Sequence, residues 1–159
     1  MGNRPGADVM FCLVAGENNR ETALPGECSP KLFGGDDFGD VIARLAGIRP
    51  PQCEYSDASE EAYRHYWGLK RAAAVACPVV FVNPCQEGDT SQAIAPREAR
   101  FSFDWDDPMA LLDMGIIGRD TAEWKATLEE WAKKLGLDPA RIAAANPNGP
   151  QWRINVTYG

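Results

Sequence analysis

A group of five carboxylates between positions 87 and 107 is spaced so that it could hold a cation or bind a positively charged partner. Asp104, Asp106 and Asp107 stand almost side by side, and Glu87 and Asp89 lie in the polar segment before them. Closely spaced carboxylate oxygens are the ligands that hard divalent cations prefer. Each aspartate also has a simpler role, on the solvent side of a predicted strand or at a predicted helix start. We therefore expect no metal or cofactor, and we assign all five to a binding surface.

The string Gly34-Gly35-Asp36-Asp37-Phe38 resembles the signature of diguanylate cyclases and their polymerase-like palm relatives. In that family an acidic pair binds metal, and the glycines let a nucleotide approach the backbone. The resemblance implies a small metal-dependent nucleotide-handling enzyme. The alternative is a loop that ends in a helix cap at one of the two aspartates. The following residues, 39–45, form a helical pattern, which favours the cap.

Residues suited to nucleophilic or proton-transfer chemistry are few. His65 is the single histidine, which excludes multi-histidine metal sites and leaves one candidate base. Cysteines stand at positions 12, 28, 53, 77 and 85, with no Cys-x-x-Cys. We expect free thiols in a reducing cytoplasm, and disulfides 28–53 or 77–85 are the alternative. Nucleophile elbows, P-loops and dinucleotide fingerprints are absent from the sequence, which favours a protein that is not an enzyme.

A second set of candidate binding residues is aromatic. Tyr63, Tyr66 and Trp67 fall in one predicted helix, and aromatic side chains at helical spacing are more typical of a core than of an interface. Trp67 differs, because it lies outside the apolar face of that helix, beside Tyr63 and near Arg64 and Arg71. Tryptophan, tyrosine and arginine are the residues that dominate binding energy in interfaces. We therefore add Trp67 and Tyr63 to the predicted binding surface.

The charge balance argues against direct binding to nucleic acid. The 159 residues carry 23 acidic and 16 basic side chains, a net charge of −7. The first 57 residues hold 5 basic and 9 acidic side chains, and the last 59 hold 6 and 9, so neither end is basic. Binding to a phosphate backbone needs a basic footprint that is missing here. The longest apolar run, 9–15, is too short to span a bilayer, and we expect a cytoplasmic protein with no membrane partner.

Periodicity predicts four strands separated by helices. The expected strands cover 8–15, 79–82, 98–105 and 152–158. The expected helices cover 37–46, 57–77, 109–114 and 120–136, followed by a short helix from 138. We expect two capping pairs at helix starts, Asp57 with Glu60 and Asp120 with Glu123. Segments 16–35 and 83–97 are expected to be loops.

This order of elements is that of the split βαβ, or ferredoxin-like, fold. It predicts a single α+β domain over 1–159, with a four-stranded antiparallel sheet and helices packed on one face. The first and third strands should be central, and we expect the last strand to lie beside the third. Since this fold hosts many unrelated functions, it supplies none by itself.

Small size, acidity and the missing catalytic sets favour a non-enzymatic protein-binding domain. Our hypothesis is an accessory protein of a phage or mobile element that inhibits a host defence complex by occupying its basic nucleic-acid channel. The expected partner is a basic protein surface or protein complex, and a homo-oligomer is a further option. Two alternatives remain: the metal-dependent enzyme that uses the Gly34–Phe38 loop, and a purely structural, oligomerising module.

Overall fold

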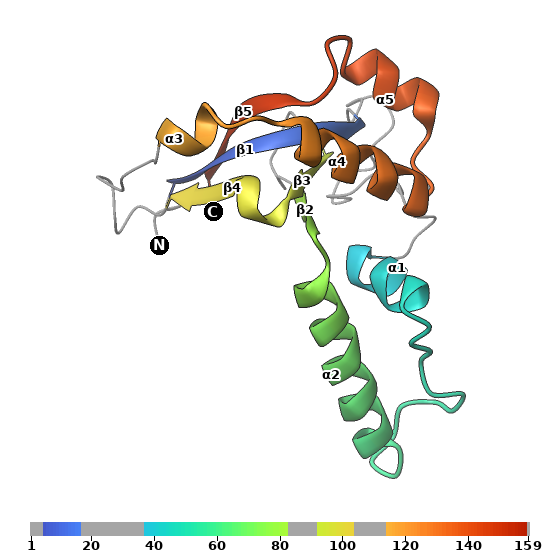
Figure 1. Cartoon of the computed structure of the whole chain (residues 1–159). Coiled ribbons are helices and arrows are strands. Elements are labelled where there is room, and N and C mark those ends of the chain that lie inside the picture. Colours follow the sequence, from blue (N-terminus) through green and yellow to red (C-terminus); the bar gives the residue numbers. More distant parts are fainter. Residues whose placement is uncertain (1–4, 17–36, 83–91, 104–113, 159) are drawn as a thin grey trace. The chain divides into compact units, whose positions relative to one another are not determined.

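The computed structural model describes residues 5–16, 37–82, 92–103 and 114–158, and the chain divides into two compact units (Figure 1). The sheet unit is Met1–Leu32 with Pro78–Gly159, and the helical unit is Phe33–Cys77. The α+β class predicted from the sequence is confirmed, whereas the single domain over 1–159 stays a prediction. The strands are β1 (Pro5–Gly16), β2 (Val79–Val82), β3 (Gln92–Pro96), β4 (Arg100–Phe103) and β5 (Gln151–Tyr158); the helices are α1 (Phe38–Leu45), α2 (Glu60–Ala76), α3 (Met114–Ile117), α4 (Ala122–Lys134) and α5 (Pro139–Ala145), with a 3-10 turn η1 (Arg97–Ala99).

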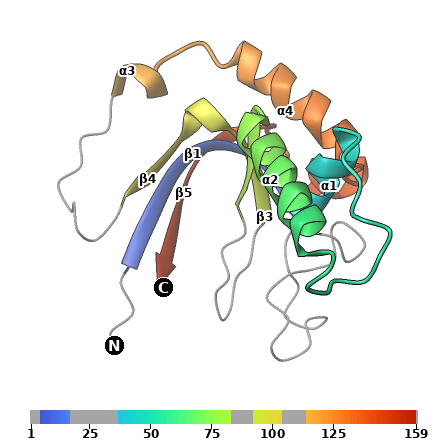
Figure 2. The same cartoon turned by 90° about the horizontal axis from the view of Figure 1, so that it is seen from below.

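The sheet unit is organised around β1, which pairs with β3, β4 and β5, always antiparallel. β4 and β5 both pair residues 7–10 of β1, so they lie on its two opposite edges, as Figure 2 shows. β3 pairs the next stretch, with Leu13 opposite Ile94, and β2 pairs β3. Residues 10–15 of β1 are all buried, so both faces of this strand are covered. The predicted central position of the first strand is confirmed.

Two predictions about the sheet are wrong. The last strand pairs the first strand and not the third, from Pro5 opposite Tyr158 to Cys12 opposite Gln151. Its alternating pattern indicates a buried face but does not specify a neighbour. The sheet also has five strands, because β3 lies within the predicted loop 83–97. β3 is short, contains two alanines and ends in a proline, all of which weaken a strand pattern.

Helices α4 and α5 pack against the sheet: α4 contacts β1, β2 and β3, and α5 contacts β1. α4 turns Trp124, Leu128 and Ala132 inward at a spacing of four residues, which places them on one helical face. The Trp124 ring lies 5.8 Å from that of Phe11 on β1, between ring centroids. Gly136, at a φ of +69°, ends the helix as predicted. Of the helix expected over 109–114, residues 109–113 lie outside the described residues, and α3 begins at Met114.

The buried side chain of Asn146 links the end of α5 to β1 by hydrogen bonds. Its Oδ1 accepts a hydrogen bond from the Val14 N–H at 2.9 Å, and its Nδ2 donates to the carbonyls of Val14 and Ile142, both at 2.8 Å. Since β5 pairs β1 only as far as Cys12, the amide supplies partners for Val14 beyond the end of that pairing. Asp138 caps α5 by accepting from the N–H of Ala140, as the sequence predicts.

The helical unit consists of two helices that contact each other, α1 and α2. α1 buries Val41, Ile42 and Ala43, whereas α2 has no buried residue. The predicted capping pair Asp57–Glu60 is wrong, because Ser59 stands at the N-cap of α2 and makes no side-chain capping bond. The second predicted pair is also incomplete: α4 begins after Thr121, while Asp120 accepts from the N–H of Ala122 at 2.9 Å. Across the described residues, no helix combines the length and the apolar character that crossing a membrane requires.

Candidate functional site

The acidic part of the predicted binding surface lies outside the described residues. This applies to Glu87, Asp89, Asp104, Asp106 and Asp107, which stay predictions. The described ranges carry 13 acidic and 13 basic side chains, so they are neutral as a set. The remaining residues carry 10 acidic and 3 basic side chains. The whole net charge of −7 therefore belongs to the segments between and beside the described elements.

The aromatic part lies in the helical unit, where three rings meet. Tyr63 and Trp67 stand four residues apart on α2, and Tyr55 comes from the segment that precedes this helix. Ring centroids are 5.3 Å apart for Tyr55 and Tyr63, 5.7 Å for Tyr63 and Trp67, and 5.8 Å for Tyr55 and Trp67. Each ring thus touches the other two, in stacked, tilted and edge-to-face arrangements that aromatic quadrupoles favour. We call these three residues the aromatic cluster.

The aromatic cluster is ordered by local hydrogen bonds and is nevertheless open to solvent. The Tyr63 hydroxyl donates to the carbonyl of Cys53 at 2.6 Å, which holds its ring in place. Tyr55 is 57% exposed and Trp67 is 50% exposed, while Tyr63 is half-buried. Two large aromatic side chains therefore present accessible faces on a surface that is already assembled. The sequence prediction that Trp67 is an exposed aromatic beside Tyr63 is confirmed.

Tyr55 is a member of the cluster that the sequence analysis missed. Position 55 is eight residues before Tyr63 and outside the helix, so helical periodicity carries no information about it. A turn brings it back toward α2: the Ser59 hydroxyl donates to the Glu54 carbonyl at 2.8 Å and accepts from the Ser56 N–H at 2.8 Å. The Ser-x-x-Ser spacing at 56–59 is the one signal that could have indicated this turn.

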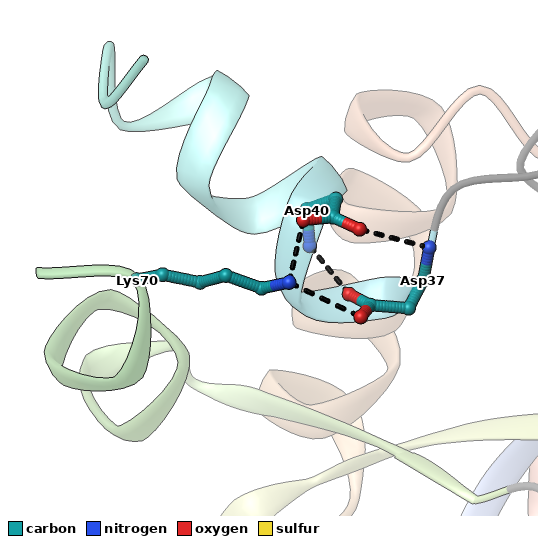
Figure 3. Close-up of polar contacts among 3 residues, drawn as sticks. All are labelled: Asp37, Asp40 and Lys70. Carbon is teal, nitrogen blue, oxygen red and sulfur yellow. Dashed lines mark hydrogen bonds and ion pairs between the residues drawn. The ribbon is translucent and has the colours of Figure 1, made fainter. Parts of the chain in front are cut away.

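The Gly34–Phe38 string ends in a helix cap at Asp37, which is the alternative favoured above; residues 34–36 lie outside the described residues. Asp37 Oδ1 accepts from the Asp40 N–H at 2.7 Å, and Asp40 Oδ2 accepts from the Asp37 N–H at 3.3 Å, which is a reciprocal capping box. Figure 3 shows that Lys70 of α2 joins both carboxylates, at 3.1 Å to Asp37 and 2.5 Å to Asp40. A Cβ on Gly39 would lie 2.8 Å from Lys70 Cε, so glycine leaves the room that this lysine needs.

The Asp37–Asp40–Lys70 group stabilises the charged forms of its members. The hydrogen bond from Lys70 is the largest cause that lowers the pKa of Asp40 below its ordinary 3.8. Burial alone would lower the pKa of Lys70, but hydrogen bonds and attraction from Asp40 and Asp37 together outweigh it and raise that pKa. The carboxylate of Asp37 thus accepts hydrogen bonds from the Asp40 backbone N–H and from the Lys70 ammonium group. This arrangement fits a residue that caps α1 and forms an ion pair with α2.

Other residues with reactive side chains are dispersed. His65 lies on the exposed side of α2, in a shallow open hollow of about 390 Å³ lined also by Glu61, Arg64 and Leu69. Cys12 and Cys53 are free thiols, which contradicts the alternative disulfide 28–53. The alternative disulfide 77–85 stays a prediction, because position 85 lies outside the described residues. Within the ranges that the structure describes, no three His, Cys, Asp or Glu side chains are grouped to hold a metal ion.

No protein-family model, curated protein or solved structure matches this chain. The interpretation of the site therefore depends on its geometry and charge.

Proposed function

We propose that this chain is a non-enzymatic protein-binding domain that docks a partner through the aromatic cluster, Tyr55, Tyr63 and Trp67. The observation that carries the proposal is a preformed group of three rings of which two are at least half exposed. Tyrosine and tryptophan bring large contact areas with few rotatable bonds, and they dominate binding energy when a partner covers them. Because contacts and the Tyr63–Cys53 hydrogen bond already order the rings, little conformational entropy is lost on binding.

The partner that fits the charge distribution is a basic protein surface or protein complex. Ten acidic side chains against three basic ones lie in the segments outside the described ranges, and they include all five predicted carboxylates. Such an excess attracts a positive partner over about one Debye length, roughly 8 Å at physiological salt. The acidic segments steer the encounter, and the aromatic cluster supplies short-range affinity. One occupant of this description is the basic nucleic-acid channel of a host defence complex, which an accessory protein of a phage or mobile element would block.

We also propose the ferredoxin-like arrangement for the sheet unit. β3 and β4 pair successive stretches of β1 and are separated only by the three-residue turn η1. Counted as one interrupted strand, they leave the first and third strands in the centre of an antiparallel sheet. That order supports the split βαβ topology and turns the observed five strands into the four that the topology requires.

The proposal is tested by capturing a partner from native host extract, identifying it by mass spectrometry, and measuring its affinity for defined variants. Trp67→Ala should weaken binding by about tenfold or more, as expected for a central aromatic contact. Val75→Ala is the matched control, because Val75 is an exposed apolar residue of the same helix that is not part of the cluster. Equal binding by the two variants would contradict docking through the aromatic cluster.

The steering part of the proposal has its own measurement. Charge reversal at Asp104, Asp106 and Asp107 should slow association at low salt, and the difference from the unaltered chain should shrink as salt is added. The melting temperature should change little, apart from a cap loss of about 1 kcal/mol if Asp107 begins a helix. Association that is independent of salt would leave the net charge with a role in solubility alone.

A further inference from the structure

One face of the sheet carries polar side chains in two cross-strand rows. Asp8 of β1 stands opposite Ser102 of β4 and opposite Asn155 of β5. Met10, two residues further, stands opposite Arg100 and Arg153 on the same two strands. Residues two apart on a strand share a face, and directly opposed residues share it too. These six side chains therefore form one surface across β4, β1 and β5, which we call the sheet-face site.

Asp8 is a buried acid in the middle of that surface. It is only 7% exposed, and its Oδ1 accepts from Arg100 Nε at 3.1 Å and from the Ser102 hydroxyl at 2.6 Å. The single bond through Nε fixes the direction of the arginine side chain. That bond uses Nε, so the two Nη groups at the outer edge of the guanidinium are not the donors to Asp8. A planar pair of N–H donors of this kind matches the oxygens of a carboxylate or phosphate.

Two further donors border the same place. Asn155 Nδ2 is buried and has no hydrogen-bond partner within the part of the chain that the structure describes. A buried donor without an acceptor is costly and uncommon in a folded protein. Arg153 of β5 is exposed, and it stands on the other side of Met10 from Arg100. Burial raises the pKa of the Cys12 thiol to about 11, and the positive charge of Arg153 lowers that pKa in part. The register of β5 against β1 places Arg153 on the face of the sheet that Met10 and Cys12 share.

We propose that the sheet-face site binds one oxyanion, a phosphate or carboxylate group of a ligand, between Arg100 and Arg153, with Asn155 Nδ2 as a further donor. Asp8 neutralises one of the two arginines and orients it, so the surface keeps a net charge of one positive unit for the anion. Met10 stands opposite both arginines in the register, and its side chain is buried in the apolar core with Cys12 and Ala93. The site lies in the sheet unit and is independent of docking through the aromatic cluster.

The test is an NMR titration of ¹⁵N-labelled protein with sodium phosphate, with sodium glutarate as the carboxylate probe, and with sodium chloride at matched ionic strength. Phosphate, glutarate or both should shift the Asn155 side-chain amide and the Arg100 Nε–H saturably, whereas chloride should not. The arm that saturates at lower concentration identifies the group that the site prefers. Shifts that are equal for all three salts would overturn the proposal.

Substitutions make the assignment specific. Arg153→Gln should weaken the phosphate or glutarate affinity by about tenfold, which corresponds to the loss of a charge-assisted contact. The control is Arg141→Gln on α5, because Arg141 is also exposed but belongs to a helix and not to the strands of the sheet-face site. Asn155→Ala serves as a second variant and should weaken the affinity without changing the net charge. Both exposed arginine variants should retain the backbone amide spectrum of the folded chain, and equal affinities for them would contradict the site.

Discussion

The sheet unit and the helical unit are stabilised in different ways. In the sheet unit, β1 has six consecutive buried residues, 10–15, and α4 turns a row of apolar side chains inward against the sheet. In the helical unit, α2 is 17 residues long and buries none of them. Among the described residues, α2 contacts the capped helix α1, its Lys70 forms ion pairs with Asp37 and Asp40, and its Tyr63 and Trp67 rings touch at the surface.

This difference bears on where a partner would bind. A surface whose apolar side chains are already covered gains little from a further contact, because their area has been removed from water. A surface that leaves Trp67, Tyr55 and Leu69 exposed has that gain still available, at roughly 25 cal/mol for each Å² that a partner covers. Among the described residues of the sheet unit, Ile154 is the one large apolar side chain that is exposed, so the helical unit leaves more apolar area available to a partner.

The largest expected effect separates the two units by stability. Leu128→Ala in α4 should cost about 2–5 kcal/mol in the free energy of unfolding, since Leu128 is 0% exposed and its removal leaves a cavity. Leu69→Ala in α2 makes the same chemical change at a position that is 42% exposed and should cost about 0.5 kcal/mol or less. Guanidinium unfolding curves of both variants give the comparison. Similar losses would mean that α2 is buried as completely as α4.

An intermediate effect is expected where the sheet unit depends on a buried polar group. Asn146→Ala removes three hydrogen bonds and leaves the Val14 backbone without its partners, at a cost of about 2–3 kcal/mol. Asn148→Ala is the matched control, because this asparagine is exposed in the turn that follows. Urea unfolding should show a clear loss for the first variant and almost none for the second. A negligible loss of unfolding free energy in Asn146→Ala would show that β1 does not depend on these hydrogen bonds.

The positions that the sequence predicts well are those governed by local chemistry. Asp37, Gly136 and Asp138 delimit helices through a cap or a left-handed turn, which depend on a few neighbouring residues. β5 is predicted by its own alternation, but its neighbour is decided by the surface of β1 over a separation of more than 130 residues. β3 was missed because pairing with β1 and β2 on its two edges, and not its own pattern, makes it a strand.

The candidate site divides in the same way. Tyr63 and Trp67 could be found because they share a helical face, whereas Tyr55 joins them through a turn that no periodic pattern describes. The Asp8–Arg100 contact could not be predicted from the sequence, although both residues lie in predicted strands. Asp8 precedes an apolar run and Arg100 falls on the polar side of a predicted strand, so each fits its own segment, and only the register of β1 against β4 brings them together.

The smallest expected effect concerns the ion pairs of the helical unit and depends on pH. Because the pKa of Asp40 is lowered in the folded chain, its contribution to stability is present above about pH 4, the ordinary pKa, and is lost as the pH falls through the lower folded value. The pKa of Lys70 is raised, so its contribution persists throughout this range and would be lost only above 10.5. Lys70→Gln should therefore destabilise the helical unit at neutral pH by about 1 kcal/mol or less, as expected for partly exposed pairs.

Amide hydrogen exchange in α1 measures this effect locally, through the protection factors of residues 41–43. In the unaltered chain they should fall as the pH drops from 6 toward 3, and in Lys70→Gln they should begin lower and change less. Lys133→Gln is the matched control, because Lys133 is exposed on α4 and belongs to the sheet unit. If Lys70→Gln kept the full protection and pH dependence of the unaltered chain, the ion pairs of Lys70 would contribute nothing measurable to the stability of α1. The ion pairs could then not be what joins α1 to α2, and contacts between the apolar side chains of the two helices would have to carry the helical unit.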